Sequence, residues 1–169
     1  MTMSKQEVIL GLLKVTVDGV NLGYSRGANR FTVSRVFHAI KANGDMGDTV
    51  NTEILDEERA TLNINQLTMT PDEFVKIFPA AANSSGTLTP TGAVNDLTDY
   101  HTVVALAKTK EGKTVTITLN NAFCKSNIDW QFNERDEVVS NVQFEACYAV
   151  QSDIWDYTAP YSIVFANAG

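Results

Sequence analysis

The chain has 169 residues, with 13 Lys and Arg side chains against 20 Asp and Glu side chains, which gives a formal net charge of −7. This length suggests one domain, and the 44% hydrophobic and 20% charged fractions exclude a disordered or collagen-like chain. The acidic balance argues against a tight nucleic-acid binder, and no apolar run approaches the ~20 residues that cross a bilayer. No signal-peptide pattern is present, so we expect cytosolic synthesis and reduced thiols at Cys124 and Cys147.

Alternation of apolar and polar residues with a period of two dominates the chain and predicts β-strands. In chain order, the expected strands are 13–17, 31–40, 50–55, 60–67, 102–108, 114–119, 142–150 and 161–165. The clearest is 142–150, where Val142, Phe144 and Ala146 fall on one face. Turn residues separate the runs, as antiparallel neighbours require, and the break at 110–113 predicts a hairpin turn.

One segment departs from this period and predicts a helix. Thr70 and Glu73 form a capping box with Pro71 at the first helical position, and apolar residues then recur at helical spacing up to Phe78. Pro79 ends the pattern, so the helix is short, and we expect it to cover an open sheet face. The segment 80–95 is small, polar and punctuated by Gly and Pro, which predicts a long surface loop. The expected fold is therefore mainly β, an antiparallel sandwich or barrel with one short α-helix.

The residues Gly23 to Gly27 satisfy the G-x-S-x-G pattern of a serine nucleophile elbow, with Ser25 as the candidate nucleophile. An elbow needs a strand-to-helix turn on a parallel sheet, whereas a strand follows here and no βαβ alternation is present. A triad would also need His38 or His101 as its base. We interpret the pattern as a turn between strands, and the serine enzyme as a hypothesis that the sequence disfavours.

No other cluster matches a known chemical site. Asp45, Asp48, Asn51 and Glu53 lack the calcium-loop register, and Asp56-Glu57-Glu58 is interpreted as a solvated charge run. The two histidines lack ligand-spaced neighbours, and no glycine-rich phosphate loop occurs. Lysines 108, 110 and 113 are interpreted as a solubilising turn. We therefore expect no catalytic residue, no metal and no cofactor.

The order of elements in the first half nevertheless resembles a known family. The segment 15–23 reads VTVDGVNLG and precedes a glycine-containing turn at Gly27, a strand over 30–40 and the connection NGDMGDTV at 43–50. An acidic strand pair running to Met69 closes this block. Over roughly residues 12–70 the chain resembles the tail tube, or major tail, proteins of long-tailed bacteriophages and of related prophages and tail-like particles.

This resemblance implies a structural virion protein rather than an enzyme, with residues 1–169 forming one β-sandwich domain. Tail tube subunits form hexameric rings whose inner sheets join into a barrel, and the rings stack into a tube that conducts double-stranded DNA without sequence recognition. The implied partners are further copies of the chain, a tape measure and a tail terminator. The implied location is the phage tail, after assembly in the host cytoplasm.

The resemblance also implies an inter-subunit or inter-ring contact in the loop after the early strands. In this sequence the loop comprises Ala42, Asn43, Gly44, Asp45, Met46, Gly47, Asp48, Thr49, Val50 and Asn51. Self-association is physically reasonable because closing unpaired sheet edges against identical copies removes an aggregation hazard. A conduit wall should be acidic or weakly charged so that DNA moves freely, and the net charge of −7 agrees with this expectation.

Two alternatives remain open beside this interpretation. The first is the tube subunit of a secretion system or of a tail-like bacteriocin, which builds similar rings without DNA transit. The second is a small carbohydrate-binding β-sandwich, for which Trp130, Trp155 and Tyr157 are the candidate stacking residues, although aromatics in such domains are more often core or interface residues.

The loop assignment yields a first testable prediction. Replacing both Asp45 and Asp48 by Lys should impair tube assembly or stacking, because the loop is expected to contact a neighbouring subunit or ring, while the monomer stays folded. Electron microscopy measures assembly, and circular dichroism of the same sample controls for folding. Normal tubes from the double variant would contradict a role for this loop in the contact.

Overall fold

The computed structural model describes residues 9–44, 46–47, 50–94, 98–149 and 158–166. Of these described residues 52% lie in strands and 5% in the one helix, so the predicted class, mainly antiparallel β with one short helix, is confirmed. The elements are β1 (Ile9–Val17), β2 (Val20–Asn21), β3 (Arg30–Ala39), β4 (Glu53–Gln66), α1 (Pro71–Ile77), β5 (Ala81–Ser84), β6 (Thr87–Pro90), β7 (His101–Thr109), β8 (Thr114–Cys124), β9 (Ser140–Ala146) and β10 (Tyr161–Phe165).

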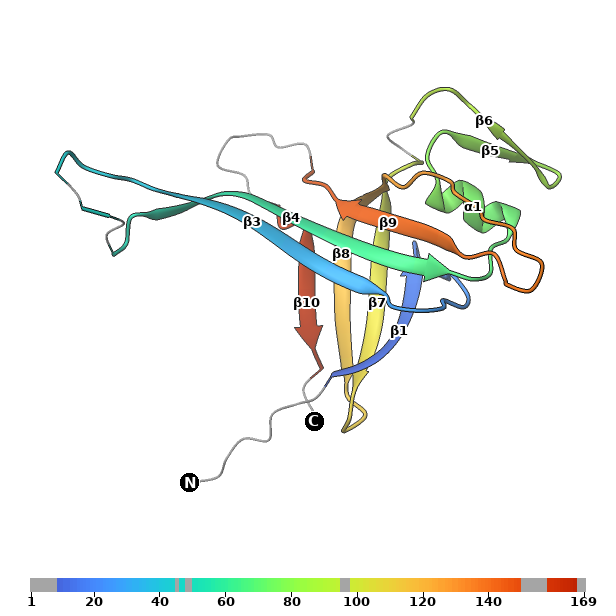
Figure 1. The fold of residues 1–169 in the computed structure, drawn as a ribbon, viewed down its shortest axis with the longest axis horizontal. Coiled ribbons are helices and arrows are strands. Elements are labelled where there is room, and N and C mark those ends of the chain that lie inside the picture. The colour runs from blue at the N-terminus through green and yellow to red at the C-terminus, as the bar shows by residue number, and fades with distance from the viewer. Residues whose placement is uncertain (1–8, 45, 48–49, 95–97, 150–157, 167–169) are drawn as a thin grey trace.

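The strands form two layers that share β8. In the first layer the order is β2-β1-β7-β8, and β10 pairs with the first half of β8, from Val115 to Leu119. The second half of β8, from Ala122 to Cys124, pairs instead with β9, which leads to β4 and β3. Between the two halves Asn121 has a φ of 47°. The strand therefore bends from one layer into the other, and Figure 1 shows β3, β4 and β9 crossing the upright β1, β7, β8 and β10.

The core lies between these crossed layers. β1, β4, β7, β8 and β9 contribute alternate side chains to it, as a period of two requires. Its fully buried large side chains include Val17, Leu62, Ile64, Val103, Val115, Leu119, Val142 and Phe144. The predicted inward faces of the strands around Val115 and Val142 are confirmed, although β9 ends at Ala146 rather than continuing to 150.

The helix prediction is confirmed in detail. The Thr70 Oγ1 accepts from the Glu73 amide at 3.3 Å, and the Glu73 Oε2 accepts from the Thr70 amide at 2.8 Å. Phe74, Ile77 and Phe78 are buried in the core cluster, so α1 closes one end of the sandwich. The prediction of a structureless surface loop over 80–95 is wrong. Residues 81–90 form the β5–β6 hairpin, whose turn places Ser85 and Gly86 at positive φ.

The division of 50–67 into two strands is also wrong. β4 is one strand of 14 residues, because Asp56 forms a bulge opposite β3 instead of a break. The register passes from Val36 opposite Glu57 to Phe37 opposite Leu55. A bulge of this kind keeps the ladder continuous while changing which β4 side chains share a face with β3.

The crossed core yields a stability prediction. Phe144→Ala should lower the free energy of unfolding by about 3–5 kcal/mol, because it leaves a cavity where both layers meet. Phe132→Ala is the matched control, since Phe132 is 76% exposed and its loss should change the free energy by less than about 0.5 kcal/mol. Urea unfolding of dilute protein, followed by circular dichroism, measures both. Equal losses in the two variants would contradict the assigned core.

Candidate assembly surfaces

The first surface is a four-stranded antiparallel sheet, β1-β7-β8-β10, that is open at both sides. In the described part of the chain β10 pairs only with β8. On the other side, β2 pairs only with Thr16 and Val17, so the preceding part of β1 has no neighbouring strand there among the described residues. Unpaired edges of this kind are templates for pairing with another chain.

The hydrogen-bond pattern shows which amides of β10 point away from β8. The Asn120 amide donates to the Pro160 carbonyl at 2.8 Å, and the Ala166 amide donates to the Thr114 carbonyl at 2.9 Å. Because antiparallel bonding alternates along a strand, even-numbered residues of β10 bond β8. The amide of Ile163 therefore faces the open edge.

The face of this sheet that points away from the core is rich in hydroxyl groups and contains no carboxylate among its described side chains. From the strand registers, its members are Lys14, Thr16, Thr102, Val104, Leu106, Lys108, Thr114, Thr116, Thr118, Asn120, Ser162 and Val164. The predicted hairpin turn at 110–113 lies at one end of this face, between β7 and β8. The acidic residues of the chain are thus concentrated elsewhere.

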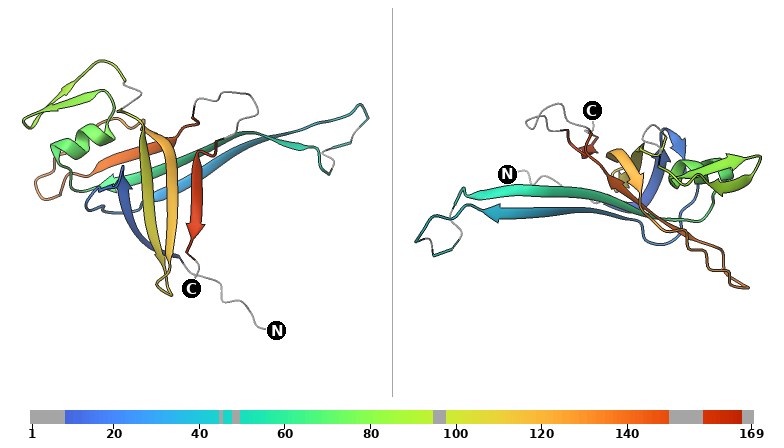
Figure 2. Two further views of the ribbon diagram at one scale, coloured as in Figure 1. Left: turned by 180° about the vertical axis from the view of Figure 1, so that it is seen from behind. Right: turned by 90° about the horizontal axis from the view of Figure 1, so that it is seen from above.

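The second surface is the part of the β3–β4 hairpin that leaves the body of the molecule, residues 36–57, which we call the projecting hairpin (Figures 1 and 2). It carries one Lys against five acidic residues, or −4 of the net charge of −7. Its exposed large apolar side chains are Val36, Phe37, Ile40, Met46, Val50, Ile54 and Leu55. A strand pair this apolar and this exposed is typical of an interaction surface.

Phe37 and Leu55 are central to that surface. They form a cross-strand pair on the face that, nearer the body, carries Phe31 and Leu62 against the core. The Asp56 bulge brings Leu55 onto this face, whereas Ile54 stands opposite His38 on the other. Phe37 is 53% exposed and Leu55 is 44% exposed. The apolar face of the sheet therefore continues beyond the body, where nothing in the described part of the chain covers it.

A polar cluster at Glu58 fixes the point where the hairpin leaves the body. The Glu58 Oε1 accepts from the Tyr161 hydroxyl at 2.7 Å and from the Arg35 Nε at 3.0 Å. The Tyr148 hydroxyl donates to the Glu58 backbone carbonyl at 3.3 Å. These contacts tie the hairpin to the open-edged strand β10. Side-chain hydrogen bonding with Tyr161 is the larger cause, and hydrogen bonding with Glu58 together with its charge the smaller cause, of a raised pKa at Arg35, so the guanidinium stays charged.

The third surface is an apolar pocket of about 330 Å³ at the opposite end of the molecule from the hairpin. It lies between the start of α1, β6 and the segment 125–139, and we call it the α1 pocket. Its lining residues are Leu67, Met69, Thr70, Pro71, Phe74, Leu88, Trp130, Phe132, Val138 and Ser140.

The walls of the α1 pocket are fixed by specific contacts. The Trp130 indole N–H donates to the Ser140 Oγ at 2.6 Å, and its ring packs edge-on against Phe74 with centroids 6.1 Å apart. Arg26 forms an ion pair with Glu137 that joins 125–139 to the turn before β3. The backbone N–H of Glu137 and the charge of Arg26 lower the pKa of that carboxyl. The pocket is therefore preformed, with Phe132 standing 76% exposed at its rim.

The residues of the rejected serine site do not meet. The Ser25 Oγ accepts from the Asn29 side chain at 3.0 Å, whereas His38 pairs with Asp56 on the hairpin and His101 pairs with Asp18 on the body. The glycine pattern has a structural cause: Gly23 has a φ of 79°, and a Cβ there would lie 2.6 Å from the Thr68 Oγ1. The interpretation of 23–27 as a turn between strands is confirmed.

The other candidate residues are placed as follows. Within the described residues no group of three or more His, Cys, Asp or Glu side chains could hold a metal ion. The two cysteines, which the sequence predicts to be reduced, are both free thiols in the structure. Burial raises the pKa of Cys124 and of Cys147 above the ordinary value of a thiol. The interpretation of 56–58 as a solvated charge run is wrong for Glu58, which is only 9% exposed, whereas Asp56 and Glu57 are exposed. Among the helices that the structure describes, none is long and apolar enough to cross a membrane.

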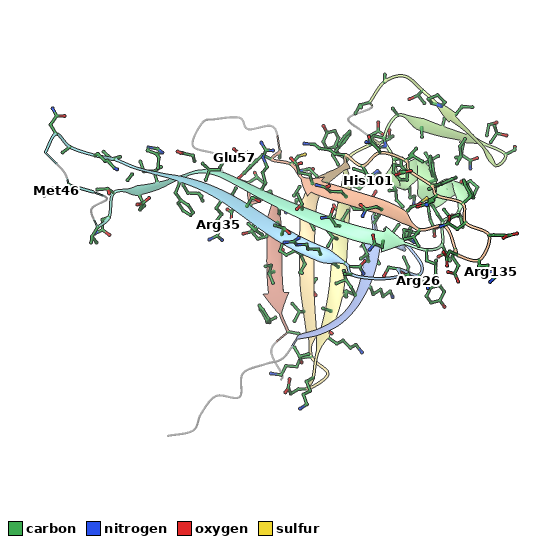
Figure 3. All side chains as sticks on the ribbon, viewed as in Figure 1. Arg26, Arg35, Met46, Glu57, His101 and Arg135 are labelled. Atoms are coloured by element: carbon green, nitrogen blue, oxygen red, sulfur yellow. The ribbon has the colours of Figure 1, made fainter. Side chains whose placement is uncertain are left out.

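The loop 42–51 lies at the far end of the projecting hairpin, and Figure 3 shows Met46 there, at the opposite end of the molecule from Arg135. Asp45, Asp48 and Thr49 lie outside the described residues. So do Trp155 and Tyr157, two of the three candidate sugar-stacking aromatics. The third, Trp130, is 41% exposed and directs its indole N–H to Ser140 in the pocket wall.

Sequence reasoning missed the Glu58 cluster, although a signal for it was present. Glu58 is in phase with Ala60, Leu62 and Ile64, the inward residues of β4, and Arg35 is in phase with Phe31. The alternation along β4 therefore predicts that Glu58 faces inward. Its acidic neighbours favoured the opposite interpretation, that of a solvated charge run. No such signal exists for the α1 pocket, because its walls come from segments far apart in the chain.

No protein-family model matches this chain, and no curated protein matches it significantly. Its function must therefore be inferred from the surfaces of the molecule.

The Glu58 cluster yields a third prediction. Tyr161→Phe should lower the free energy of unfolding by about 1.5–3 kcal/mol, the usual contribution of a hydrogen bond to a charged group. Tyr24→Phe, at a tyrosine that is 76% exposed, is the matched control and should leave stability unchanged. Denaturant unfolding measures both variants. An unchanged Tyr161→Phe protein would show that the hydroxyl does not hold β10 to the hairpin.

Proposed function

We propose that this protein is a structural tail tube subunit, which assembles into rings of six that stack into a hollow tube for the passage of phage DNA. The observation that carries the proposal is the sheet β1-β7-β8-β10, which is open at both edges in the described part of the chain. The resemblance of residues 12–70 to tail tube proteins agrees with it.

The strand directions of this sheet suit closure into a ring. β1 and β8 run one way, and β7 and β10 run the other way, because each neighbouring pair is antiparallel. When the β10 edge of one copy meets the β1 edge of the next, the new pair is antiparallel as well. Repetition of this contact continues one sheet from copy to copy, and rotational closure leaves no free edge in the ring.

The outward face of the sheet suits a conduit for DNA. The ring can close with this face toward the lumen while the second layer, β3, β4 and β9, lies outside it. The lumen is then lined mainly by threonine, asparagine and serine, with Lys14 and Lys108 as the charged members. This wall carries two lysines and no described carboxylate per copy, so the acidic excess of the chain lies on other surfaces and does not line the lumen. Two scattered lysines on a surface of hydroxyl groups neutralise few phosphates, so a duplex is held weakly and can slide.

The remaining surfaces fit an assembly better than an isolated module. The projecting hairpin exposes apolar side chains that a monomer leaves in water, which is costly unless another copy covers them. A tube for protein secretion or a tail-like bacteriocin would use the same contacts without DNA. Isolating the assembled particles from the host and testing them for encapsulated DNA distinguishes a phage tube, which belongs to a DNA-containing particle, from a secretion tube or a tail-like bacteriocin.

Assembly through β10 gives the experiment. Purified protein should form rings or tubes in negative-stain electron microscopy, and Ile163→Pro should abolish them, because proline removes the amide that faces the open edge and leaves the bonds to β8 intact. Ile163→Ala is the matched control: it removes most of the side chain, keeps the amide, and should still assemble.

The outcomes are distinct. A wild-type protein that stays monomeric at millimolar concentration would overturn the proposed function. Normal rings from a folded Ile163→Pro variant would exclude pairing through the β10 edge. Circular dichroism of both variants separates a loss of assembly from a loss of folding.

A further inference from the structure

We infer that the α1 pocket is the receptor for the projecting hairpin of a neighbouring copy in the same ring, with Phe37 and Leu55 as the side chains that it receives. This inference rests on the proposed function and names the contact that supports the ring outside its inner sheet. It is carried by three observations: two apolar surfaces of matching character, their positions on opposite sides of one chain, and the spacing between them.

The chemistry of the two surfaces matches. The pocket is lined mainly by leucine, methionine, proline and aromatic side chains. Its polar side chains are bonded within the chain: the Trp130 indole donates to Ser140, and the Thr70 hydroxyl accepts from the Glu73 amide. The lining residues include no charged side chain. Phe37 and Leu55 are an apolar pair on a rigid strand ladder, and within the described residues no side chain covers them. Apolar side chains in a preformed apolar pocket need only the exclusion of water.

The positions of the two surfaces allow contact only between copies. The hairpin projects past the β10 side of the inner sheet, whereas the α1 pocket lies beyond its β1 side (Figures 1 and 2). A chain cannot fold its own paired strands back across its body. A neighbour whose β1 edge meets β10 brings its pocket to the side on which the hairpin projects. The two contacts thus follow from one head-to-tail arrangement, as a heterologous interface requires.

The spacing agrees as well. Four strands about 4.8 Å apart, tilted by about 40°, occupy roughly 25 Å of the circumference of a barrel. In a ring of six, the second layer lies about 10 Å farther from the axis and repeats every ~36 Å. Along extended chain, Leu55 lies about 40 Å from Leu67 on the pocket wall, at about 3.3 Å per residue. The neighbouring pocket therefore falls near Phe37 and Leu55, whereas Met46 at the tip lies well beyond it.

Cysteine cross-linking tests this contact. In a Cys147→Ser background, with Cys124 buried and retained, the pair Leu55→Cys and Phe132→Cys should yield a ladder of covalent oligomers under mild oxidation on a non-reducing gel. Either substitution alone should give no ladder. The control pairs combine Phe132→Cys with Met46→Cys at the tip or with Lys110→Cys at the β7–β8 turn, and they should give no ladder either.

Each outcome decides the inference. A ladder from the Leu55 and Phe132 pair alone supports it. Intact rings by electron microscopy with no such ladder, or with a ladder from the Met46 pair instead, would overturn it and leave the proposed function standing. A wild-type protein that forms no rings would remove the proposed function and the inference together. A second variant, Phe37→Asp, should raise the concentration required for ring formation at least tenfold, whereas Tyr24→Asp, at a tyrosine that is 76% exposed and lies outside both the projecting hairpin and the α1 pocket lining, should leave it unchanged.

Discussion

The backbone of an edge strand needs partners for its amides and carbonyls, and this need organises the molecule. In β10 the alternate amides that do not bond β8 face outward, and among the described residues no strand pairs with the first part of β1 on its outer side. Water can satisfy such groups, so the monomer is not forbidden, but long exposed edges with apolar side chains invite pairing. Here Val164 and Phe165 are each more than half exposed on β10. β10 contains no charged residue and no proline and pairs with β8 without a bulge, so its open edge can pair with another strand, whereas β1 carries Lys14 and an irregularity between Ile9 and Leu13.

The Glu58 cluster connects this edge to the rest of the structure. A carboxylate in a nearly buried position is costly unless its oxygens are bonded, and here Tyr161 from β10 and Arg35 from β3 supply the donors. Because the bonds are directional, they set the angle at which the hairpin leaves the body relative to β10. The edge and the hairpin are thus presented together as one surface. A purely apolar contact at this position would hold the two strands without fixing their orientation as closely.

The sequence predicts the local elements well where one physical signal dominates. The capping box at Thr70 fixes the helix start, and the alternation around Val115 and Val142 identifies inward faces correctly. It fails where signals compete. The acidic run at 56–58 looks like a break, yet a bulge absorbs Asp56 and Glu58 stays in phase with the core. Likewise, Gly86 and the small residues of 80–95 signal a loop, yet a short hairpin satisfies their backbone groups. Neither the crossing of the layers through β8 nor the α1 pocket has a local signature, because both depend on segments distant in the chain.

The projecting hairpin combines acidic residues with exposed apolar side chains, and the two features together restrict which surfaces it can contact. With five acidic residues against one Lys, hairpins of separate copies repel one another, which disfavours a symmetric hairpin-to-hairpin dimer that would bury Phe37 and Leu55 in a dead end. The lining of the α1 pocket is mainly apolar and carries no charged side chain, although Asp72 and Glu73 directly follow its lining residue Pro71, so the pocket can bury the pair in the proposed head-to-tail contact. A head-to-tail contact repeats, and the backbone edges of β1 and β10 then determine whether the repetition closes. In the proposed assembly, the charge of the hairpin thus disfavours the symmetric contact, and the sheet edges set the geometry.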